Sequence, residues 1–196
     1  MKLRLKLLKD YSDVFKEDLE PSDVMKGEIK AELNDLDITP THISTPASVP
    51  VHLRKAADKE LARCLKAGVL EPCNHWTPWV SRGMFVPKAT KEGEELRVRL
   101  VSDLKGLNKK LKHSLYPNES SQALLKRLNN KHRYFSCIDF SSGYHQCLLR
   151  PEDRDYFAIL LPQGKFRYTR WAQGAAPSGD NFLILSDPGL RGRSWI

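Results

Sequence analysis

One segment constrains the fold of this chain more than any other: a short apolar, β-rich run that ends in a carboxylate. Residues 134–146 read Tyr-Phe-Ser-Cys-Ile-Asp-Phe-Ser-Ser-Gly-Tyr-His-Gln. The pattern predicts a strand with Asp139 at its end, followed by a turn of small residues and the aromatic Tyr144. That order suits a site where a strand holds an acidic metal ligand while backbone and a ring approach a nucleotide closely. An ordinary strand that ends in an Asx turn explains the segment equally well.

The length and composition allow one domain, or one large domain cut short. The chain has 196 residues, and 40% of them are hydrophobic, which is enough for a packed core. No run of about 18 or more apolar residues occurs, so we expect no membrane span. The N-terminus alternates charged and apolar residues and therefore lacks the unbroken apolar segment of a signal peptide.

The positive charge of the chain is unevenly distributed. The formal net charge is +8, yet residues 1–50 hold 7 Lys and Arg against 10 Asp and Glu, while the rest of the chain holds 25 against 14. A basic body suits a polyanionic partner, because Lys and Arg displace counterions from phosphates. A generically basic protein without such a partner has the same composition.

The four cysteines are Cys64, Cys73, Cys137 and Cys147, and they form no CxxC pair. The triplet Cys73-Asn-His75 has no second ligand pair at zinc-site spacing, so we interpret it as loop sequence. Cys137 and Cys147 lie in strand-like apolar runs and are expected to be buried thiols.

Periodicity and turn residues predict an α+β chain. Apolar residues at helical spacing predict a leader helix within residues 1–20, and four prolines among residues 21–50 predict an extended linker. A basic helix over 52–67 is expected to end at Gly68. We further expect strands at 84–87, 96–101, 134–139, 145–149 and 156–161, a tight turn at 161–165 with a return strand at 166–171, and helices at about 120–129 and from Pro177.

Six sequence blocks resemble the motifs of one protein family, and they occur along the chain in the same order as in that family. They are Lys66-Ala-Gly-Val-Leu-Glu-Pro72; Trp79-Val-Ser81 with Met84-Phe-Val-Pro-Lys88; residues 96–109; the Asp139 segment; Gly164-Lys-Phe-Arg-Tyr-Thr-Arg170; and Gln173-Gly-Ala-Ala-Pro-Ser-Gly-Asp-Asn-Phe182. Together they resemble the reverse transcriptase of gypsy-like long-terminal-repeat retrotransposons. The resemblance implies a right-hand polymerase fold, with fingers and an incomplete palm over residues 51–196, no thumb, and a leader helix and extended linker over 1–50.

The same resemblance implies roles for particular residues around Asp139. Asp139 matches the first catalytic aspartate and is expected to bind Mg²⁺ together with the backbone carbonyl of Phe140. Magnesium prefers oxygen ligands, and nucleotidyl transfer uses a two-ion clamp. Tyr144 matches the aromatic residue beneath the incoming sugar, a role that is compatible with simple packing.

Further residues are implied to bind the incoming nucleotide. Arg99 matches the fingers arginine on the triphosphate, and Arg97 is the competing candidate on the same strand face; an arginine fork suits a pair of phosphate oxygens. The triphosphate lysine is Lys88 or Lys91. The pair Gln173-Gly174 matches the family's residues near the 3′-hydroxyl and the template base, although the preceding Trp171-Ala172 departs from the usual pattern.

The implied partners are an RNA or DNA template with its primer, a deoxynucleoside triphosphate (dNTP), and the remainder of a Pol polyprotein. We expect template phosphates along the basic residues of the fingers. These residues are Lys105, Lys109, Lys110, Lys112, Lys126, Arg127, Lys131 and Arg133. Since no targeting signal is seen, the expected location is the cytoplasm or an element particle.

The family's second catalytic element, a hairpin with two adjacent aspartates, has no counterpart, because the sequence contains no Asp-Asp pair. Asp180 near a helix start and Asp187 in an Asp-Pro context are not assigned to metal. With one of three expected carboxylates, we predict that the chain as written has no polymerase activity. The alternative function is that of a non-catalytic nucleic-acid-binding remnant of a retrotransposon.

Overall fold

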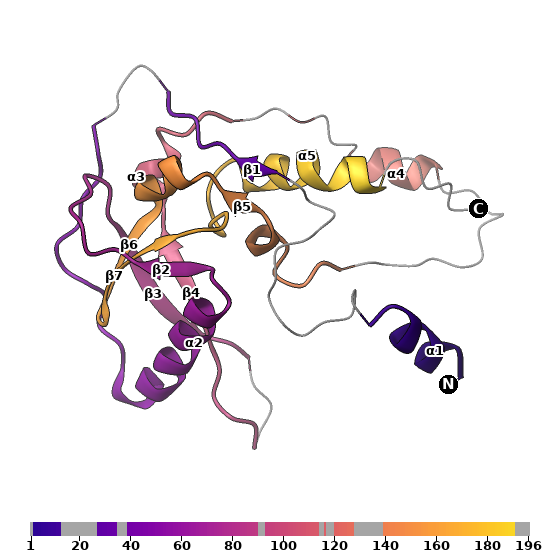
Figure 1. Cartoon of the computed structure of the whole chain (residues 1–196), viewed down its shortest axis with the longest axis horizontal. Coiled ribbons are helices and arrows are strands. Elements are labelled where there is room, and N and C mark those ends of the chain that lie inside the picture. The colour runs from indigo at the N-terminus through magenta and orange to yellow at the C-terminus, as the bar shows by residue number, and fades with distance from the viewer. Residues whose placement is uncertain are drawn as a thin grey trace.

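A computed structural model of the chain describes residues 2–12, 27–34, 39–89, 93–113, 116, 120–127 and 139–190. A five-stranded sheet in the order β2-β7-β6-β3-β4 organises this part of the molecule (Figure 1). The strands are β2 (Leu70–Pro72), β3 (Ser81–Pro87), β4 (Val98–Asp103), β6 (Ala158–Leu161) and β7 (Gly164–Tyr168).

Two antiparallel hairpins, β3–β4 and β6–β7, form most of this sheet. Strands β3 and β6 join them in parallel, with Ser81 opposite Ile159 and Arg82 opposite Leu160. The Leu161 side chain packs directly on Gly83 here, since a Cβ on Gly83 would lie 2.4 Å from it. Strand β2 adds to the outer side of β7. The sheet therefore combines segments that are distant in the sequence.

The basic helix predicted over 52–67 is confirmed as a 3₁₀-turn, Val51–Leu53, followed by α2 (Arg54–Lys66). Helix α2 packs its apolar face on the sheet, with Ala57, Leu61 and Cys64 buried. Gly68 follows with a φ of 61°, the left-handed conformation that glycine adopts at helix ends without strain. The tight turn after β6 is confirmed, and its return strand β7 is confirmed in part, because it spans Gly164–Tyr168 where the sequence predicted 166–171.

The N-terminal residues described by the structure are helical and then extended. Helix α1 spans Lys2–Asp10, and β1 (Glu28–Ile29) pairs in parallel with β5 (Leu148–Leu149). The backbone N–H of Ala31 donates to the buried carboxylate of Asp153 at 2.9 Å. Within the extended segment 39–50, Thr41 and Ile43 form backbone hydrogen bonds with Val80. The proposed division of the chain at residue 50 stays a prediction.

The remaining elements are short, apart from the last helix. They are α3 (Lys105–Asn108), α4 (Ser121–Arg127), the 3₁₀-helices η2 (Gly143–Gln146) and η3 (Pro151–Phe157), and α5 (Ser178–Leu190). The predicted strand at 145–149 is wrong in its first half, because η2 continues through Gln146. The predicted strand at 156–161 begins only at Ala158, because Pro151 starts a 3₁₀-helix. Of the predicted strand at 134–139, only Asp139 lies among the described residues.

The core lies between α2, the sheet and the segment that leads into α5. Its largest fully buried side chains include Trp171 and Phe157, whose ring centroids are 5.3 Å apart. Burial of such apolar surface is the main driving force for folding. No helix in the described part of the chain is long and apolar enough to cross a membrane.

Candidate nucleotide-binding site

Two adjoining cavities lie between α2, β4, η2 and the turn before α5. The first has a volume of about 230 Å³ and the second about 220 Å³, and they share Ser142, His145 and Gln173 in their walls. The first is further lined by Glu60, Arg63, Cys64, Val69, Lys88, Arg99, Leu100 and Tyr168, and the second by Phe140, Gly143 and Tyr144. The two cavities together form the candidate site.

The backbone around Ser142 brings the Asp139 segment into the site. Ser142 has a φ of 49°, and it is the one non-glycine residue with positive φ among the residues that the structure describes. This left-handed step reverses the chain after Phe140 and starts η2. Gly143 lies so close to α5 that a Cβ there would be 2.8 Å from the Phe182 ring. A side chain at position 143 would therefore push η2 away from α5.

Tyr144 is held in place by aromatic packing. The Phe182 ring from α5 makes edge-on contacts with Tyr144 and with Phe140, at centroid distances of 5.8 and 5.5 Å. Edge-to-face pairs of this kind are favoured by the ring quadrupoles. The packing role that the sequence allowed for Tyr144 is therefore present, and it fixes the ring at the wall of the second cavity.

Main-chain hydrogen bonds place η2 beside Gln173. The N–H of Leu149 donates to the carbonyl of Thr169 at 3.0 Å, and the N–H of Trp171 donates to the carbonyl of Cys147 at 2.9 Å. The strand that leaves η2 thus runs against the segment that leads to Gln173. These contacts explain how Tyr144 and Gln173, 29 positions apart in the sequence, come to line one cavity.

A buried arginine joins the walls of the site. Arg170 is buried, and its guanidinium donates to the carbonyl of His145 at 3.1 Å and to the carbonyl of Ala67 at the end of α2. Carbonyls at a helix end have no partner within the helix, so a cation there is favourable. Neither Arg170 nor His145 is predicted from the sequence to be a site residue. The one available signal was a charged residue in the otherwise apolar surroundings of Tyr168–Ala172.

The first cavity carries an excess of positive charge. Three cations line it, namely Arg63, Lys88 and Arg99, against the single carboxylate of Glu60. Arg63 and Glu60 pair with each other through two hydrogen bonds of 2.8 Å. Lys88 and Arg99, which are exposed, therefore leave the wall net positive. Such a wall favours an anionic ligand.

His145 is the titratable group between the two cavities. Both ring nitrogens are buried without a hydrogen-bond partner. Burial, with the nearby positive charges of Arg63 and Arg170, lowers the pKa of His145 to about 4, while Glu60 acts in the opposite direction. The imidazole is therefore neutral at physiological pH, and the residue lines both cavities.

We expect His145→Phe to reduce the loss of stability on acidification. The folded-state pKa lies below the unfolded value of 6.5, so the unfolded state binds the proton more readily. The neutral His145 side chain therefore contributes to the free energy of unfolding above pH 6.5. This contribution is lost as the pH falls towards 4, by an amount on the order of 2 kcal/mol. Urea unfolding at pH 7 and pH 4.5 measures it. Equal pH dependence in wild type and His145→Phe would contradict the prediction, and exposed His52→Gln is the control.

The structure gathers most of the predicted nucleotide residues. Lys88, Arg99 and Gln173 line the first cavity, and Phe140, Tyr144 and Gln173 line the second. The competing Arg97 is not among the lining residues, and Lys91 lies outside the described part of the chain.

Asp139 and Gly174 flank the cavities rather than line them. Asp139 is exposed and directly precedes Phe140. Gly174 has a φ of 94°, and open space surrounds its α-carbon. Its carbonyl accepts a hydrogen bond of 2.9 Å from the Asn108 side chain, which ties the turn to α3. Among the described residues, no group of three metal-ligating side chains includes Asp139.

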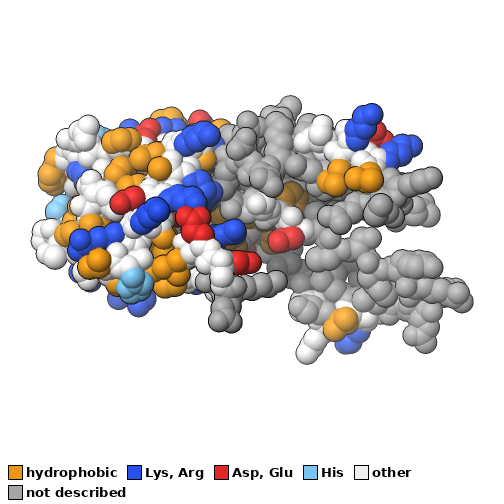
Figure 2. Space-filling view, turned by 90° about the horizontal axis from the view of Figure 1, so that it is seen from below, with side chains coloured by type: hydrophobic (Ala, Val, Ile, Leu, Met, Phe, Trp, Pro, Cys, Tyr) orange, Lys and Arg blue, Asp and Glu red, His pale blue; other side chains and the backbone are white. Residues whose placement is uncertain are grey.

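Basic side chains cover much of the described surface. Figure 2 shows one face on which Lys and Arg side chains are spread across the body, with a smaller number of Asp and Glu between them. Of the predicted template-binding residues, Lys105, Lys109, Lys112 and Lys126 are exposed and Lys110 is half-buried. The side chains of Arg127, Lys131 and Arg133 lie outside the described residues.

Solved structures with a similar fold come from foamy viruses. The chain matches the prototype foamy virus protease-reverse transcriptase with a TM-score of 0.71 and 22% identity, over 93% of this chain and 24% of that one. It matches a foamy viral protease-reverse transcriptase in complex with dsDNA with a TM-score of 0.72 and 17% identity, over 97% and 36%. The mixed helix and strand fold is thus similar to that of the foamy virus protease-reverse transcriptases.

Related sequences are found among the Pol polyproteins of retrotransposons. The Pol polyprotein of transposon opus from Drosophila melanogaster is 28% identical over 185 residues, which is 94% of this chain and 18% of that protein. The Pol polyprotein of transposon gypsy, also from Drosophila melanogaster, is 30% identical over 135 residues, or 68% and 13%. No protein-family model matches the chain. The chain is therefore a domain related to retrotransposon Pol polyproteins, and it spans less than a fifth of the length of these relatives.

Proposed function

We propose that this chain is the fingers and part of the palm of an RNA-directed DNA polymerase from a gypsy-like retrotransposon, with the polymerase portion over residues 51–196. The parent reaction adds deoxynucleotides to a primer 3′ end under the direction of a template. One observation carries the proposal: the adjoining cavities gather Lys88, Arg99, Tyr144 and Gln173 from separate segments of the chain. These are the positions that the family resemblance implies for nucleotide binding.

Residues from both cavities are proposed to contact the dNTP. Arg99 and Lys88 meet the triphosphate, because cations on a net positive wall attract phosphate oxygens and a guanidinium donates to two of them at once. The Tyr144 ring, fixed by Phe182, supports the sugar from the second cavity. Gln173 lies at the boundary of the two cavities and contacts the nucleotide between sugar and base.

Asp139 and Phe140 supply oxygen ligands for Mg²⁺ in this proposal. The exposed Asp139 carboxylate and the following carbonyl fit a hard cation that keeps several waters. Bound magnesium stabilises charge on the attacking and leaving oxygens in nucleotidyl transfer. A two-ion site needs further carboxylates, and no described residue joins Asp139 in a three-donor group. Asp139 and the Phe140 carbonyl therefore provide only some of the ligands that a two-ion magnesium site needs. We propose that this chain alone does not catalyse nucleotide addition.

Primer and template bind along the basic surface. The exposed Lys105, Lys109, Lys112 and Lys126 offer positive charge without base-reading groups, as expected for contacts that position a nucleic acid. Foamy viral protease-reverse transcriptases of similar fold have been solved with dsDNA and with an RNA/DNA hybrid. The same surface supports the alternative function, a nucleic-acid-binding remnant without a nucleotide site.

The test measures binding and catalysis separately. We expect the full chain to bind a fluorescent RNA/DNA primer-template, with an affinity that falls steeply with salt because counterions are released. A complementary dNTP with Mg²⁺ should strengthen that binding more than a mismatched dNTP does, whereas a simple nucleic-acid-binding remnant would show no difference. Primer extension should be absent.

Two results would contradict the proposal. Primer extension that disappears in Asp139→Ala would show that the chain is catalytic by itself. Failure of the folded protein to bind the primer-template at low salt would remove the nucleic-acid-binding function.

A further inference from the structure

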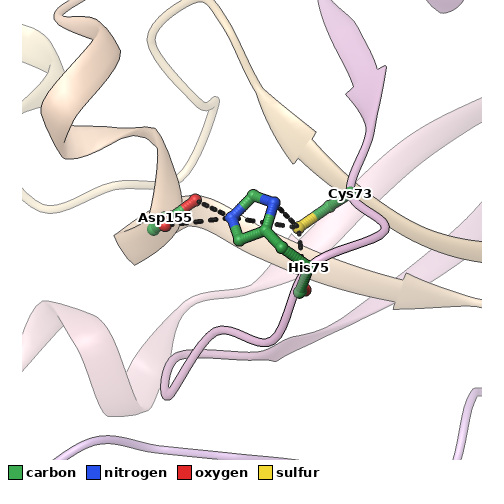
Figure 3. Close-up of side chains that lie close together, drawn as sticks. All are labelled: Cys73, His75 and Asp155. Atoms are coloured by element: carbon green, nitrogen blue, oxygen red, sulfur yellow. Dashed lines mark hydrogen bonds and ion pairs between the residues drawn. The ribbon is translucent and has the colours of Figure 1, made fainter.

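A cysteine, a histidine and an aspartate meet at the far end of the β2–β7 pair from the cavities. Cys73 and His75 follow β2, and Asp155 comes from η3, 80 positions after His75 (Figure 3). One donor atom from each side chain lies within 4.8 Å of the other two. We call these three residues the Cys-His-Asp cluster. It is the one group of three or more potential metal-ligating side chains in the part of the chain that the structure describes.

From the sequence alone, Cys73-Asn-His75 is interpreted as loop sequence, because no second ligand pair follows at zinc-site spacing. The structure places the triplet in a loop and adds Asp155 as a third donor. No spacing rule could find this partner, because pairing of β2 with β7 and the adjacent η3 bring it in from a distant segment.

We propose that the Cys-His-Asp cluster binds Zn²⁺ through the Cys73 thiolate, the His75 imidazole and the Asp155 carboxylate. The mixture of sulfur, nitrogen and oxygen donors is the set that zinc accepts, and the soft thiolate disfavours magnesium and calcium. A water molecule completes the coordination, since the side chains of His75 and Asp155 are 49% and 38% exposed. This site is separate from the Mg²⁺ ligands proposed at Asp139.

The distances within the cluster suit a shared ion. His75 Nε2 lies 3.0 and 3.1 Å from the two carboxylate oxygens of Asp155, and Cys73 Sγ lies 3.9 Å from each ring nitrogen. Ligands about 2.0–2.3 Å from a tetrahedral zinc are themselves separated by about 3.3–3.8 Å. Small side-chain rotations would therefore lengthen the His75–Asp155 distance and shorten the distance from Cys73 Sγ to the His75 ring, so that all three donors could bind one ion.

Neighbouring groups hold the three donors in position. The backbone N–H of Cys73 donates to the carbonyl of Lys165 at 3.0 Å, and the Lys165 ammonium donates to the carbonyl of His75. Arg167 donates to an Asp155 oxygen at 2.7 Å and to Glu71 at 2.6 Å. Partners of this kind orient metal ligands and commonly change metal affinity by about 10–100-fold.

The same three residue types also occur as a nucleophile, base and orienting acid in hydrolytic enzymes. Here Cys73 is only 3% exposed, and burial raises the pKa of its thiol, although Lys165 and Arg167 act in the opposite direction. A nucleophilic cysteine needs a lowered pKa and access to substrate. A metal instead deprotonates the thiol on binding and reaches it from the exposed side formed by His75 and Asp155.

Cobalt(II) and zinc titrations of the untagged full chain test the site, with millimolar Mg²⁺ present to occupy the Asp139 position. Cobalt should produce a thiolate-to-metal charge-transfer band together with visible bands of tetrahedral intensity, and zinc should displace it. Cys73→Ser should remove the charge-transfer band. His75→Gln changes an exposed side chain and Asp155→Asn a half-buried one, and each should weaken zinc binding by at least about tenfold.

Matched variants separate this site from other groups. Cys147→Ala removes another buried thiol, His52→Gln an exposed imidazole, and Asp139→Ala the proposed magnesium ligand; all three should keep wild-type cobalt spectra. A folded wild-type protein without a thiolate charge-transfer band would overturn the proposal. Unchanged zinc affinity in His75→Gln and Asp155→Asn would overturn it as well. No nucleic acid is added, so the outcome is independent of the polymerase proposal.

Discussion

Replacing Trp171 by alanine should lower the free energy of unfolding by about 3–5 kcal/mol. The indole is 1% exposed, packs against Phe157 and donates from Nε1 to the Ser178 hydroxyl at 2.8 Å. Alanine removes this apolar surface and leaves a cavity between the sheet and the start of α5, which the surrounding side chains fill only partly. Urea unfolding followed by circular dichroism measures the change.

Trp76→Ala is the matched control for this prediction. Trp76 is 77% exposed, so removal of the same side chain should change stability by no more than about 0.5 kcal/mol. A similar shift of the urea midpoint in both variants would show that Trp171 does not anchor the core. Because the segment that carries Trp171 leads into Gln173, Trp171→Ala should also loosen the candidate site.

Replacing Arg99 by alanine should weaken dNTP binding to the primer-template complex by about 10–100-fold. Hydrogen bonds to charged groups contribute about 1.5–3 kcal/mol, and the guanidinium at the wall of the first cavity is proposed to donate to two phosphate oxygens. Arg99→Lys keeps the charge but loses the fork, and should recover part of the affinity. Titration of a fluorescent dNTP analogue against the bound primer-template provides the measurement.

Arg97→Ala is the control, because it removes the same charge two residues away. Arg97 is exposed and does not line either cavity. We expect this variant to bind dNTP within about twofold of wild type, since an exposed charge that makes no direct contact interacts only weakly through water. Equal losses in both variants would mean that overall charge, rather than a directed contact from Arg99, attracts the nucleotide.

Elements with local signals could be predicted from the sequence. The α2 helix has a clear apolar face and is followed by the left-handed Gly68, and the β6–β7 turn has proline and glycine at the expected positions. The strand predicted at 145–149 is wrong in its first half, because the residues from Gly143 to Gln146 follow a left-handed Ser142 and form η2, and only Leu148–Leu149 are in a strand. That conformation depends on close packing against Phe182, which no local pattern reveals.

The candidate site divides in the same way. Family resemblance named Arg99, Tyr144 and Gln173, and the structure brings these residues to adjoining cavities. The family resemblance did not name Arg170. The guanidinium of this residue donates to the carbonyl of Ala67, 103 positions away, and such a contact exists only once the sheet is assembled. Asp155 was missed for the same reason, since its partner His75 is 80 positions away.

The parallel contact between β3 and β6 also sets how this chain reaches its native state. The β3–β4 and β6–β7 hairpins are local and form on the microsecond scale, but their union pairs Ser81 with Ile159 and Arg82 with Leu160, residues that are 78 positions apart (159 − 81). Closing the loop between these residues lowers the conformational entropy of the chain before the contacts between the two hairpins have formed to stabilise it. We therefore expect folding in milliseconds or longer, with hairpin docking as the rate-limiting step. Substitutions at Gly83, where the hairpins meet, should slow refolding in stopped-flow measurements more than changes at the hairpin tips do.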